Sequence, residues 1–353
     1  MQDLCLPGLL FCLNYKPMKK AYYLFNPGRM SRRDNTLKFD PVPNEEHPQP
    51  KARFLPVAGV SALYVFGSLD TNSALYNFLG RNHIPVHFFD YYQHYTGSFS
   101  PKEYLLAGQM LIAQADAYRR SKPRMMIAQA LVDAAMANML RTLRYYQSRD
   151  KEVASHIIAL ESLQQQIPSA QDIGTLMGLE GNSRQQYYDS FGQIVTHFSW
   201  EGRRKRPPKD ELNALLSFGN SLCYTVCLDA IYNSQLNPTI SYLHEPGTRR
   251  YSLALDISEI FKPILVDRLI FRLCNRREIR REHFDYVDEA CFLSPKGRKV
   301  VVKNWEERLQ QTIHHRKLGR KVSYRHLLRL DCYKLAKYLL KMEPDFQPFK
   351  IWW

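Results

Sequence analysis

A histidine and two acidic residues in the second half of the chain could together hold a metal ion. His244 is followed twelve residues later by Asp256, and Glu259 comes three residues after that. Residues three apart share one face of a helix, so both carboxylates point the same way if this segment is helical. The segment is otherwise largely apolar, where a carboxylate is costly unless its charge is compensated. Histidine with carboxylates suits Mn²⁺, Mg²⁺ or non-haem Fe²⁺. The alternative is a pair of acidic residues that only complement the dipole at a helix N-terminus.

A second polar group lies earlier in the chain. Glu180, Arg184 and Tyr188 are spaced four residues apart, and residues at this spacing share one face of a helix. They could line a functional site. Alternatively, Glu180 and Arg184 could form a surface pair that contributes roughly 0.2–0.5 kcal/mol. Taken by itself, the spacing favours the surface pair.

The chain is basic, and most of the excess lies in its last part. Its 353 residues include 49 Lys and Arg against 34 Asp and Glu, which gives a formal net charge of +15. Residues 201–353 hold 29 of the basic and 18 of the acidic residues. A positive field of this size favours a polyanion such as nucleic acid, with an acidic membrane surface as the alternative.

Two short basic segments are the candidates for phosphate contacts. The first leads into a predicted helix, and the second follows His244. The first could also be a nuclear localisation patch or only a solvated loop, because short basic runs are common in loops. A loop that grips phosphates beside the site is an equally reasonable interpretation. The candidate residues are Arg203, Arg204, Lys205, Arg206, Lys209, Arg249 and Arg250.

The elements that must position these residues change in kind near residue 100. Runs of aromatic and β-branched residues before this point predict strands, with one helix between them. The predicted strands are Tyr22–Phe25, Ser61–Phe66 and Val86–Tyr92, and the predicted helix is Ser73–Asn82. Residues 1–17 lack the positive segment and the cleavage site of a signal peptide, so we interpret them as a tail or as a start upstream of the natural Met18. We therefore predict an N-terminal β domain over residues 18–99.

Residues 100–353 are predicted to be nearly all helical. The predicted helices span about 101–120, 123–149, 151–166, 169–196, 209–235 and 253–274. Ser100 with Glu103 has the pattern of a capping box, and Ser121 and Ser169 are further candidate caps. We expect a hairpin over 284–302 that turns through Ser294-Pro295-Lys296-Gly297, and a last amphipathic helix after Ser323. The fold class is thus α+β, a small β-sandwich-like domain followed by a larger all-α-helical domain.

Several classes of protein lack support in the sequence. There is no Walker loop, dinucleotide-binding glycine motif or nucleophile elbow, which argues against NTPases, dehydrogenases and α/β-hydrolases. No apolar run reaches the ~18–20 residues that a membrane span needs. Seven cysteines, an odd number, favour reduced intracellular thiols over a disulfide framework. Cys223 and Cys227 are expected to be buried thiols rather than metal ligands.

Taken together, these segments resemble the CRISPR-associated protein 1 family, the integrase of spacer acquisition, over residues 19–345. The resemblance rests on the order and spacing of several motifs, each of which would be weak alone. They are Tyr23-Leu24-Phe25-Asn26-Pro27-Gly28, Val65-Phe66-Gly67, Leu75–Phe88, Glu180-Gly181 with Arg184 and Tyr188, Arg206-Pro207-Pro208 with Asp210, Asn213–Gly219, Tyr242-Leu243-His244, and Asp256–Pro263 followed by Asp267.

The resemblance implies a function for each member of the polar groups. The metal triad and catalytic residues of the family fall on Glu180, His244 and Glu259, with Mg²⁺ or Mn²⁺ as cofactor. Asp256, Arg184 and Tyr188 support the site. Ser241 and Asn220 replace residues that are frequent in the family, which affects local packing rather than the triad. The helical domain is then the catalytic domain.

The resemblance also implies partners and a location. The protein is expected to form a homodimer through its β domains, and two dimers would be bridged by CRISPR-associated protein 2 into a heterohexamer. The substrates are double-stranded DNAs, the captured protospacer and the leader–repeat target. A cytoplasmic protein of a prokaryote with no membrane contact is expected.

The implied reaction is metal-dependent attack of a DNA 3′-hydroxyl on the phosphodiester at the leader–repeat boundary, which inserts a new spacer into the array. It needs no covalent enzyme intermediate, so the missing nucleophile motif is no objection. Two alternatives remain at this point. One is a metal-dependent nuclease that cleaves branched DNA, and the other is a DNA-binding scaffold whose acidic residues are only structural.

Overall fold

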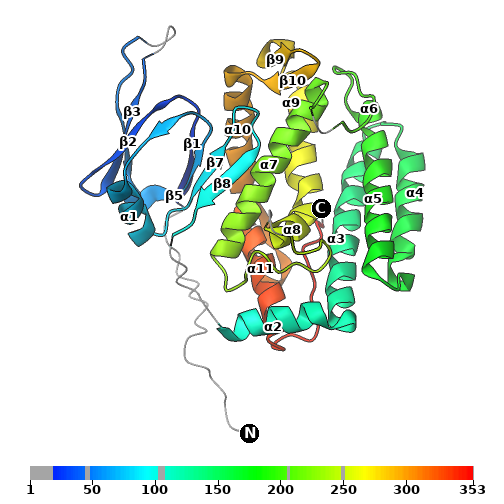
Figure 1. Ribbon diagram of the computed structural model, residues 1–353. Helices are drawn as coiled ribbons and strands as arrows, with labels where there is room; N and C mark the ends of the chain where they lie inside the picture. Colours follow the sequence, from blue (N-terminus) through cyan, green and yellow to red (C-terminus); the bar gives the residue numbers. More distant parts are fainter. Residues whose placement is uncertain (1–18, 44–47, 102–107, 205–206, 248–250, 353) are drawn as a thin grey trace. The chain divides into compact units, whose positions relative to one another are not determined.

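The computed structural model describes residues 19–43, 48–101, 108–204, 207–247 and 251–352. The chain divides into two compact units (Figure 1). Residues up to 88, together with 98–101, form the β unit, and residues 89–97 with the chain after 102 form the helical unit. The predictions for residues 1–17, Glu103, Lys205, Arg206, Arg249 and Arg250 lie outside the described residues.

The β unit contains two four-stranded sheets. One has the order β1-β5-β7-β8 and the other β4-β3-β2-β6. The strands are β1 (Lys20–Leu24), β2 (Gly28–Arg33), β3 (Thr36–Pro41), β4 (Arg53–Pro56), β5 (Val60–Val65), β6 (Leu69–Asp70), β7 (Val86–Phe89) and β8 (Tyr95–Phe99). In the first sheet β5 runs parallel to both β1 and β7. The second sheet is built on the antiparallel β2–β3 hairpin. Two sheets over one core confirm the predicted β-sandwich-like domain.

Alternating apolar residues explain why these strands pack. Met30, Leu37 and Phe39 are buried on one face of the β2–β3 hairpin. Gly28, in the Asn-Pro-Gly motif, is required there because a Cβ would lie 2.6 Å from the ring of Phe39. The helix α1 (Ser73–Arg81) adds its apolar side to the same core. The three predicted strands and the helix of this unit are confirmed, although β7 ends at Phe89 rather than Tyr92. The sequence did not predict β2, β3, β4, β6 and β8.

The second unit is mostly helical, as predicted (Figure 1). Its helices are α2 (Gly108–Arg119), α3 (Ser121–Gln147), α4 (Ala154–Gln165), α5 (Ile173–Asp189), α6 (Phe191–Ile194), α7 (Glu211–Tyr232), α8 (Ser252–Lys262), α9 (Arg268–Asn275), α10 (Pro295–Gln310) and α11 (Tyr324–Leu339). A π-helical segment, Pro263–Asp267, joins α8 to α9. The unit is not entirely helical, because it also contains the hairpins β9 (Phe284–Val287) with β10 (Ala290–Leu293) and β11 (Thr312–His315) with β12 (Arg320–Ser323).

Three local predictions are wrong in informative ways. The turn at Ser294 is not the bend of a hairpin but the start of α10, where the Ser294 hydroxyl accepts a hydrogen bond from the Gly297 N–H at 3.1 Å. A serine followed by proline suits the first turn of a helix as well as a β-turn. Asp172, not Ser169, caps α5 by accepting from the Thr175 N–H at 2.8 Å. Ser121 makes no cap, because α3 already includes it.

The most apolar helix is in the middle of the helical unit. The prediction that no apolar run is long enough for a membrane span is wrong for α7, which is long and apolar enough by length and composition. However, 78% of its most apolar window is buried inside the structure, as is typical of a core helix. Cys223 and Cys227 lie on it as buried free thiols, which confirms their prediction. Gly219 lets α7 approach the π-helical segment closely, because a Cβ there would lie 2.6 Å from Val266.

The last residues of the chain are tied into this core. The buried Asn138 of α3 donates to the carbonyl oxygens of Ile260 and Phe349, at 2.8 and 3.0 Å. Its own oxygen accepts from the Ile351 N–H at 2.8 Å. The buried Asp331 of α11 accepts from the Phe349 N–H at 2.7 Å. One amide and one carboxylate thus satisfy an otherwise irregular, buried stretch of backbone.

Candidate functional site

Asp256 holds together the loop that carries His244. Its side chain is fully buried on α8. One carboxylate oxygen accepts from the N–H groups of Tyr242 and Leu243 at 2.7 and 3.1 Å, and the other accepts from the N–H of His244 at 3.0 Å. Three backbone donors converge on one carboxylate, which compensates a charge that would otherwise be costly to bury. The same carboxylate therefore fixes the backbone of the loop.

The imidazole of His244 is oriented by the same carboxylate. Its Nδ1 lies 2.8 Å from Asp256 Oδ1. Since an ionised carboxylate can only accept, Nδ1 carries the proton and Nε2 keeps its lone pair. A histidine whose second nitrogen is held by a carboxylate is the usual arrangement of a metal ligand. Burial opposes the charged ring, but Asp256, Glu259 and Glu180 outweigh it and raise the pKa of His244.

The outer side of this loop is held by α2 and α3. Arg124 donates to the carbonyl oxygen of Tyr242 at 3.0 Å and to the carboxylate of Glu245 at 2.5 Å. The hydroxyl of Tyr118 also donates to Glu245, at 2.7 Å. The two residues on either side of Leu243-His244 are therefore fixed from another pair of helices. Nothing in the sequence pointed to Arg124, which is 118 residues from Tyr242.

Glu180 and Glu259 share one guanidinium. Arg184 lies 3.6 Å from Glu180 on the same helix, α5, and forms an ion pair with Glu259 of α8. Lys262 forms an ion pair with Glu259 from one helical turn later. Burial alone raises the pKa of the Glu259 carboxyl, but Lys262 and Arg184 lower it to about 2. The Glu180–Arg184 pair is therefore part of a buried polar centre, not the surface pair that the spacing alone favoured.

Glu180, His244 and Glu259, which come from three separate segments of the chain, thus lie close together. Both glutamates act electrostatically on His244, and Arg184 contacts both glutamates. Two carboxylates and one imidazole are a donor set that fits Mg²⁺ or Mn²⁺. Within the described residues, however, no three His, Cys, Asp or Glu side chains are arranged around one point as metal ligands. Arg184 and Lys262 instead compensate the negative charge of Glu259 through ion pairs.

A third carboxylate lies behind this centre with no strong partner. Asp267 is 1% exposed, and neither of its oxygens makes a hydrogen bond of normal geometry. The buried Tyr187 hydroxyl and one Arg184 nitrogen are also unsatisfied. Burial raises the pKa of Asp267 to about 7, although Arg184 and Lys262 oppose this. Among the described residues, Asp267 is thus a buried carboxylate of this centre that forms no ion pair.

Tyr188 closes the centre on the side of the basic linker. It is buried, its ring centroid lies 6.0 Å from the Arg184 guanidinium, and its carbonyl oxygen accepts from the Trp200 indole at 2.8 Å. Arg203 is not a free basic side chain, because it donates to Asn213 at 2.7 Å and to Ser217 at 3.1 Å on α7. The linker is thus fastened to α7 at its first arginine.

The other described candidates for phosphate contacts are more exposed. Arg204 pairs with Glu201 at 3.1 Å, and Lys209 pairs with Glu289 at 2.6 Å. Exposed pairs of this kind are weak, so both side chains can exchange a carboxylate for another anion. Lys205, Arg206, Arg249 and Arg250 are outside the described ranges.

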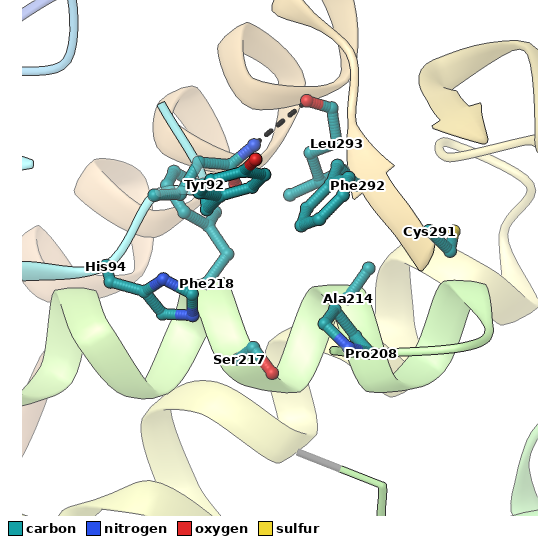
Figure 2. A pocket seen from close by; sticks show the side chains of 10 residues that line it. Tyr92, His94, Pro208, Ala214, Ser217, Phe218, Cys291, Phe292 and Leu293 are labelled. Atoms are coloured by element: carbon teal, nitrogen blue, oxygen red, sulfur yellow. Dashed lines mark hydrogen bonds between the residues drawn. The ribbon is translucent and has the colours of Figure 1, made fainter. Parts of the chain in front are cut away.

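A small pocket elsewhere in the helical unit has a different character. It is lined by residues of α7, of β10 and of the loop around Tyr92 and Gln93 (Figure 2). The amide of Gln93 donates to the Leu293 carbonyl oxygen at 3.0 Å, which ties the loop to β10. None of the lining residues is acidic. The polar centre described above is therefore the candidate functional site.

The fold and this centre define a class of α+β proteins in which a β unit is followed in the chain by a helical unit that carries two glutamates and a histidine. The family model described as CRISPR associated protein Cas1 matches residues 22–307. A CRISPR-associated endonuclease Cas1 from Fusobacterium nucleatum is 41% identical over 345 residues, which cover 98% of this chain and all of that protein. One from Moorella thermoacetica is 44% identical over 334 residues, 95% of this chain and all of that protein. The chain belongs to the Cas1 family of CRISPR-associated proteins.

Solved structures agree with this assignment. A Cas1 protein from Thermotoga maritima superposes with a TM-score of 0.82 at 37% identity, over 94% of this chain and all of that one. A casposase bound to an integration product has the same fold, with a TM-score of 0.85 at 20% identity over 94% of each chain. The family resemblance and the fold class predicted from the sequence are both confirmed.

Proposed function

We propose that this protein is a metal-dependent DNA endonuclease and integrase, which inserts DNA fragments into a CRISPR array. One observation carries the proposal: Glu180 and Glu259 share Arg184 beside a histidine that a buried carboxylate orients. The curated relatives named above are endonucleases of the same family. Joining and cutting both require a site that stabilises charge at a phosphodiester.

Glu180, His244 through Nε2, and Glu259 would hold Mg²⁺ or Mn²⁺. When bound, such an ion polarises a phosphoryl oxygen and stabilises the leaving oxygen. Asp256 keeps the imidazole in the required tautomer and fixes its loop. Arg184 and Lys262, which now pair with Glu259, would be free to contact the negatively charged phosphodiester.

The remaining basic residues would position the DNA. Arg204, Lys205, Arg206, Lys209, Arg249 and Arg250 are proposed to contact phosphates, whereas Arg203 fastens the linker to α7. Phosphate contacts fix orientation without reading the sequence. The proposed substrates are the double-stranded protospacer and the leader–repeat target. We further propose a homodimer formed through the β unit and a complex with CRISPR-associated protein 2, since a fused relative has been solved as a Cas6-RT-Cas1–Cas2 complex.

The reaction is tested with a labelled DNA fragment and a supercoiled plasmid that carries a leader and a repeat. Two fragments are compared, one ending in a 3′-hydroxyl and one in a 3′-deoxy nucleotide, with Mg²⁺ or Mn²⁺ present. Label transfer that needs the hydroxyl and is lost in His244→Ala is expected. Equal nicking of the plasmid with both fragments, without label transfer, would show a hydrolase of the branched-DNA type instead.

A further inference from the structure

The β11–β12 hairpin has an unusual charge. It follows the part of the chain that the family model matches, residues 22–307. Residues 308–330 contain seven Lys and Arg and no Asp or Glu. Four of the seven lie in the hairpin and its turn: Arg316, Lys317, Arg320 and Lys321. Neither the metal centre nor the proposed phosphate contacts at 203–209 and 249–250 uses these residues.

One side of the hairpin is anchored and the remainder is exposed. His315 and Val322 are buried, and the ring of His315 lies edge-on to Trp352 at 5.8 Å. Gly319 closes the turn with a φ of 61°, in the left-handed region that glycine adopts without strain. Lys321 pairs across the ribbon with His314, and both are exposed. The hairpin therefore presents a fixed ribbon of positive charge.

These charges are not compensated within the described part of the protein. Arg316, Arg320 and Lys321 make no ion pair with any described carboxylate, and Lys317 donates a hydrogen bond to the neutral amide of Gln347 at 3.4 Å. The pKa of His326, beside the hairpin, is lowered mainly by burial and further by the nearby charges of Arg329 and Arg320. An exposed cluster of like charges repels itself, so it gains most from a polyanion.

We propose that the β11–β12 hairpin binds the phosphate backbone of duplex DNA, at a contact separate from the Glu180–His244–Glu259 centre. The choice of DNA over another polyanion rests on the proposed function. Phosphates of duplex DNA repeat at one charge per ~1.7 Å of axis. Successive strand residues point to opposite faces, so neighbours on one face of the ribbon lie ~6.6 Å apart along a strand and ~5 Å across it. At this spacing Lys321, together with the exposed basic residues at the turn, can reach more than one such phosphate.

The hairpin is rigidly connected to the helix that carries Asp256 and Glu259. Trp352 lies 5.3 Å from the ring of Phe349, and Phe349 stacks on Phe261 of α8 at 5.8 Å with an interplanar angle of 3°. The Arg316 guanidinium lies 5.7 Å from the Trp352 ring. DNA bound by the hairpin is therefore held at a fixed offset from the carboxylates, as positioning for catalysis requires.

The test measures affinity for a duplex of about 30 base pairs, by fluorescence anisotropy between 50 and 200 mM salt. The variant Lys317→Gln/Arg320→Gln/Lys321→Gln removes three charges that have no carboxylate partner. If each contacts one phosphate, the slope of log K against log salt falls by about 2–3, and Kd at 100 mM salt rises at least about tenfold. The matched control Lys317→Arg/Arg320→Lys/Lys321→Arg keeps the charge and is expected to retain both the slope and the Kd.

Two outcomes would overturn the proposal. One is an unchanged slope and Kd in the glutamine variant, which would leave an acidic protein partner as the ligand of the hairpin. The other is an equal loss in the charge-preserving control, which would show an effect of folding rather than charge. Glu259→Gln separates this proposal from the proposed function: if it still joins DNA while the hairpin variant loses its salt slope, the proposed function fails and the hairpin contact stands.

Discussion

Asp256 and Glu259 are three residues apart on α8, yet their surroundings differ in kind. Asp256 is fully buried and its partners are three backbone N–H groups and one imidazole. Glu259 is 12% exposed, and its partners are the side chains of Arg184 and Lys262. Backbone donors cannot leave without unfolding the loop, whereas long cationic side chains can turn away. One carboxylate is therefore part of the fold, and the other is available for exchange with another cation.

The largest effect is expected from Asp256→Ala. This change leaves three buried N–H groups without an acceptor, each costing about 1–3 kcal/mol. We expect the free energy of unfolding, measured by denaturant titration, to fall by about 3 kcal/mol or more. Glu259→Gln serves as the control and should cost about 1–2 kcal/mol, since Arg184 keeps Glu180 as a partner. An equal or greater loss for Glu259→Gln would contradict the distinction between the two carboxylates.

Asp267 is a buried carboxylate that has neither the backbone N–H donors of Asp256 nor the ion pairs of Glu259. Burial raises its pKa to about 7 in the folded protein, against ~3.9 in the unfolded chain. The folded state therefore binds the proton more tightly, and this stabilisation is complete below about pH 4 and lost as pH rises through 7. The side chain in Asp267→Asn is neutral at every pH, so the free energy of unfolding of this variant does not fall for this reason as the pH rises.

Unfolding of the wild type and Asp267→Asn is compared at pH 5 and pH 7. The stability of the variant relative to the wild type should increase on the order of 2 kcal/mol between these values. A difference that stays constant across this range would mean that Asp267 is ionised at both pH values.

Removing the amino group of Lys262 would leave Glu259 with one cationic partner fewer. If Lys262 and a divalent cation compete for the same carboxylate, Lys262→Met should bind Mn²⁺ more tightly than the wild type, by about tenfold in calorimetric titration. The matched control is Lys334→Met, which removes a lysine from beside Asp331, three residues away on α11. Weaker Mn²⁺ binding by Lys262→Met would show that the lysine supports the site rather than occupying it.

The smallest effect is expected on the outside of the His244 loop. Tyr118→Phe removes one hydrogen bond to Glu245 at an exposed position. Exposed bonds contribute little, so we expect a loss of about 0.5–1 kcal/mol in thermal or denaturant unfolding. A larger loss, near that of Asp256→Ala, would mean that the loop is held mainly from outside rather than by Asp256.

The fold was predictable where local patterns are unambiguous. Alternating aromatic and β-branched residues gave β1, β5 and β7, and helical periodicity gave most of the helical unit. The segment Ser294-Pro295-Lys296-Gly297 was misinterpreted because serine, proline and glycine begin helices and form turns alike. The β11–β12 hairpin is not predicted from the sequence, because β11 is short and reads Thr-Ile-His-His, and β12 begins with the charged residues Arg320 and Lys321.

The site was only partly predictable. Spacing alone left Asp256 and Glu259 undecided between metal ligands and a helix cap, and it favoured a surface pair for Glu180 and Arg184. Only the resemblance to a family joined Glu180 and Arg184 to the group formed by His244, Asp256 and Glu259. The contacts of Arg124 with Tyr242 and Glu245 span about 120 residues, and no local pattern encodes such a contact.

The way in which the last residues are tied to Asn138 has a consequence for biosynthesis. The amide of Asn138 on α3 can form these hydrogen bonds only after Phe349 and Ile351, which are more than 200 residues later in the chain, have been synthesised. The same amide also holds the end of α8 through Ile260. Contacts so distant in sequence slow folding, and units generally fold in the order of their synthesis. The β unit can therefore mature on the ribosome, whereas the contacts of Asn138 in the helical unit form only after Ile351 has been made.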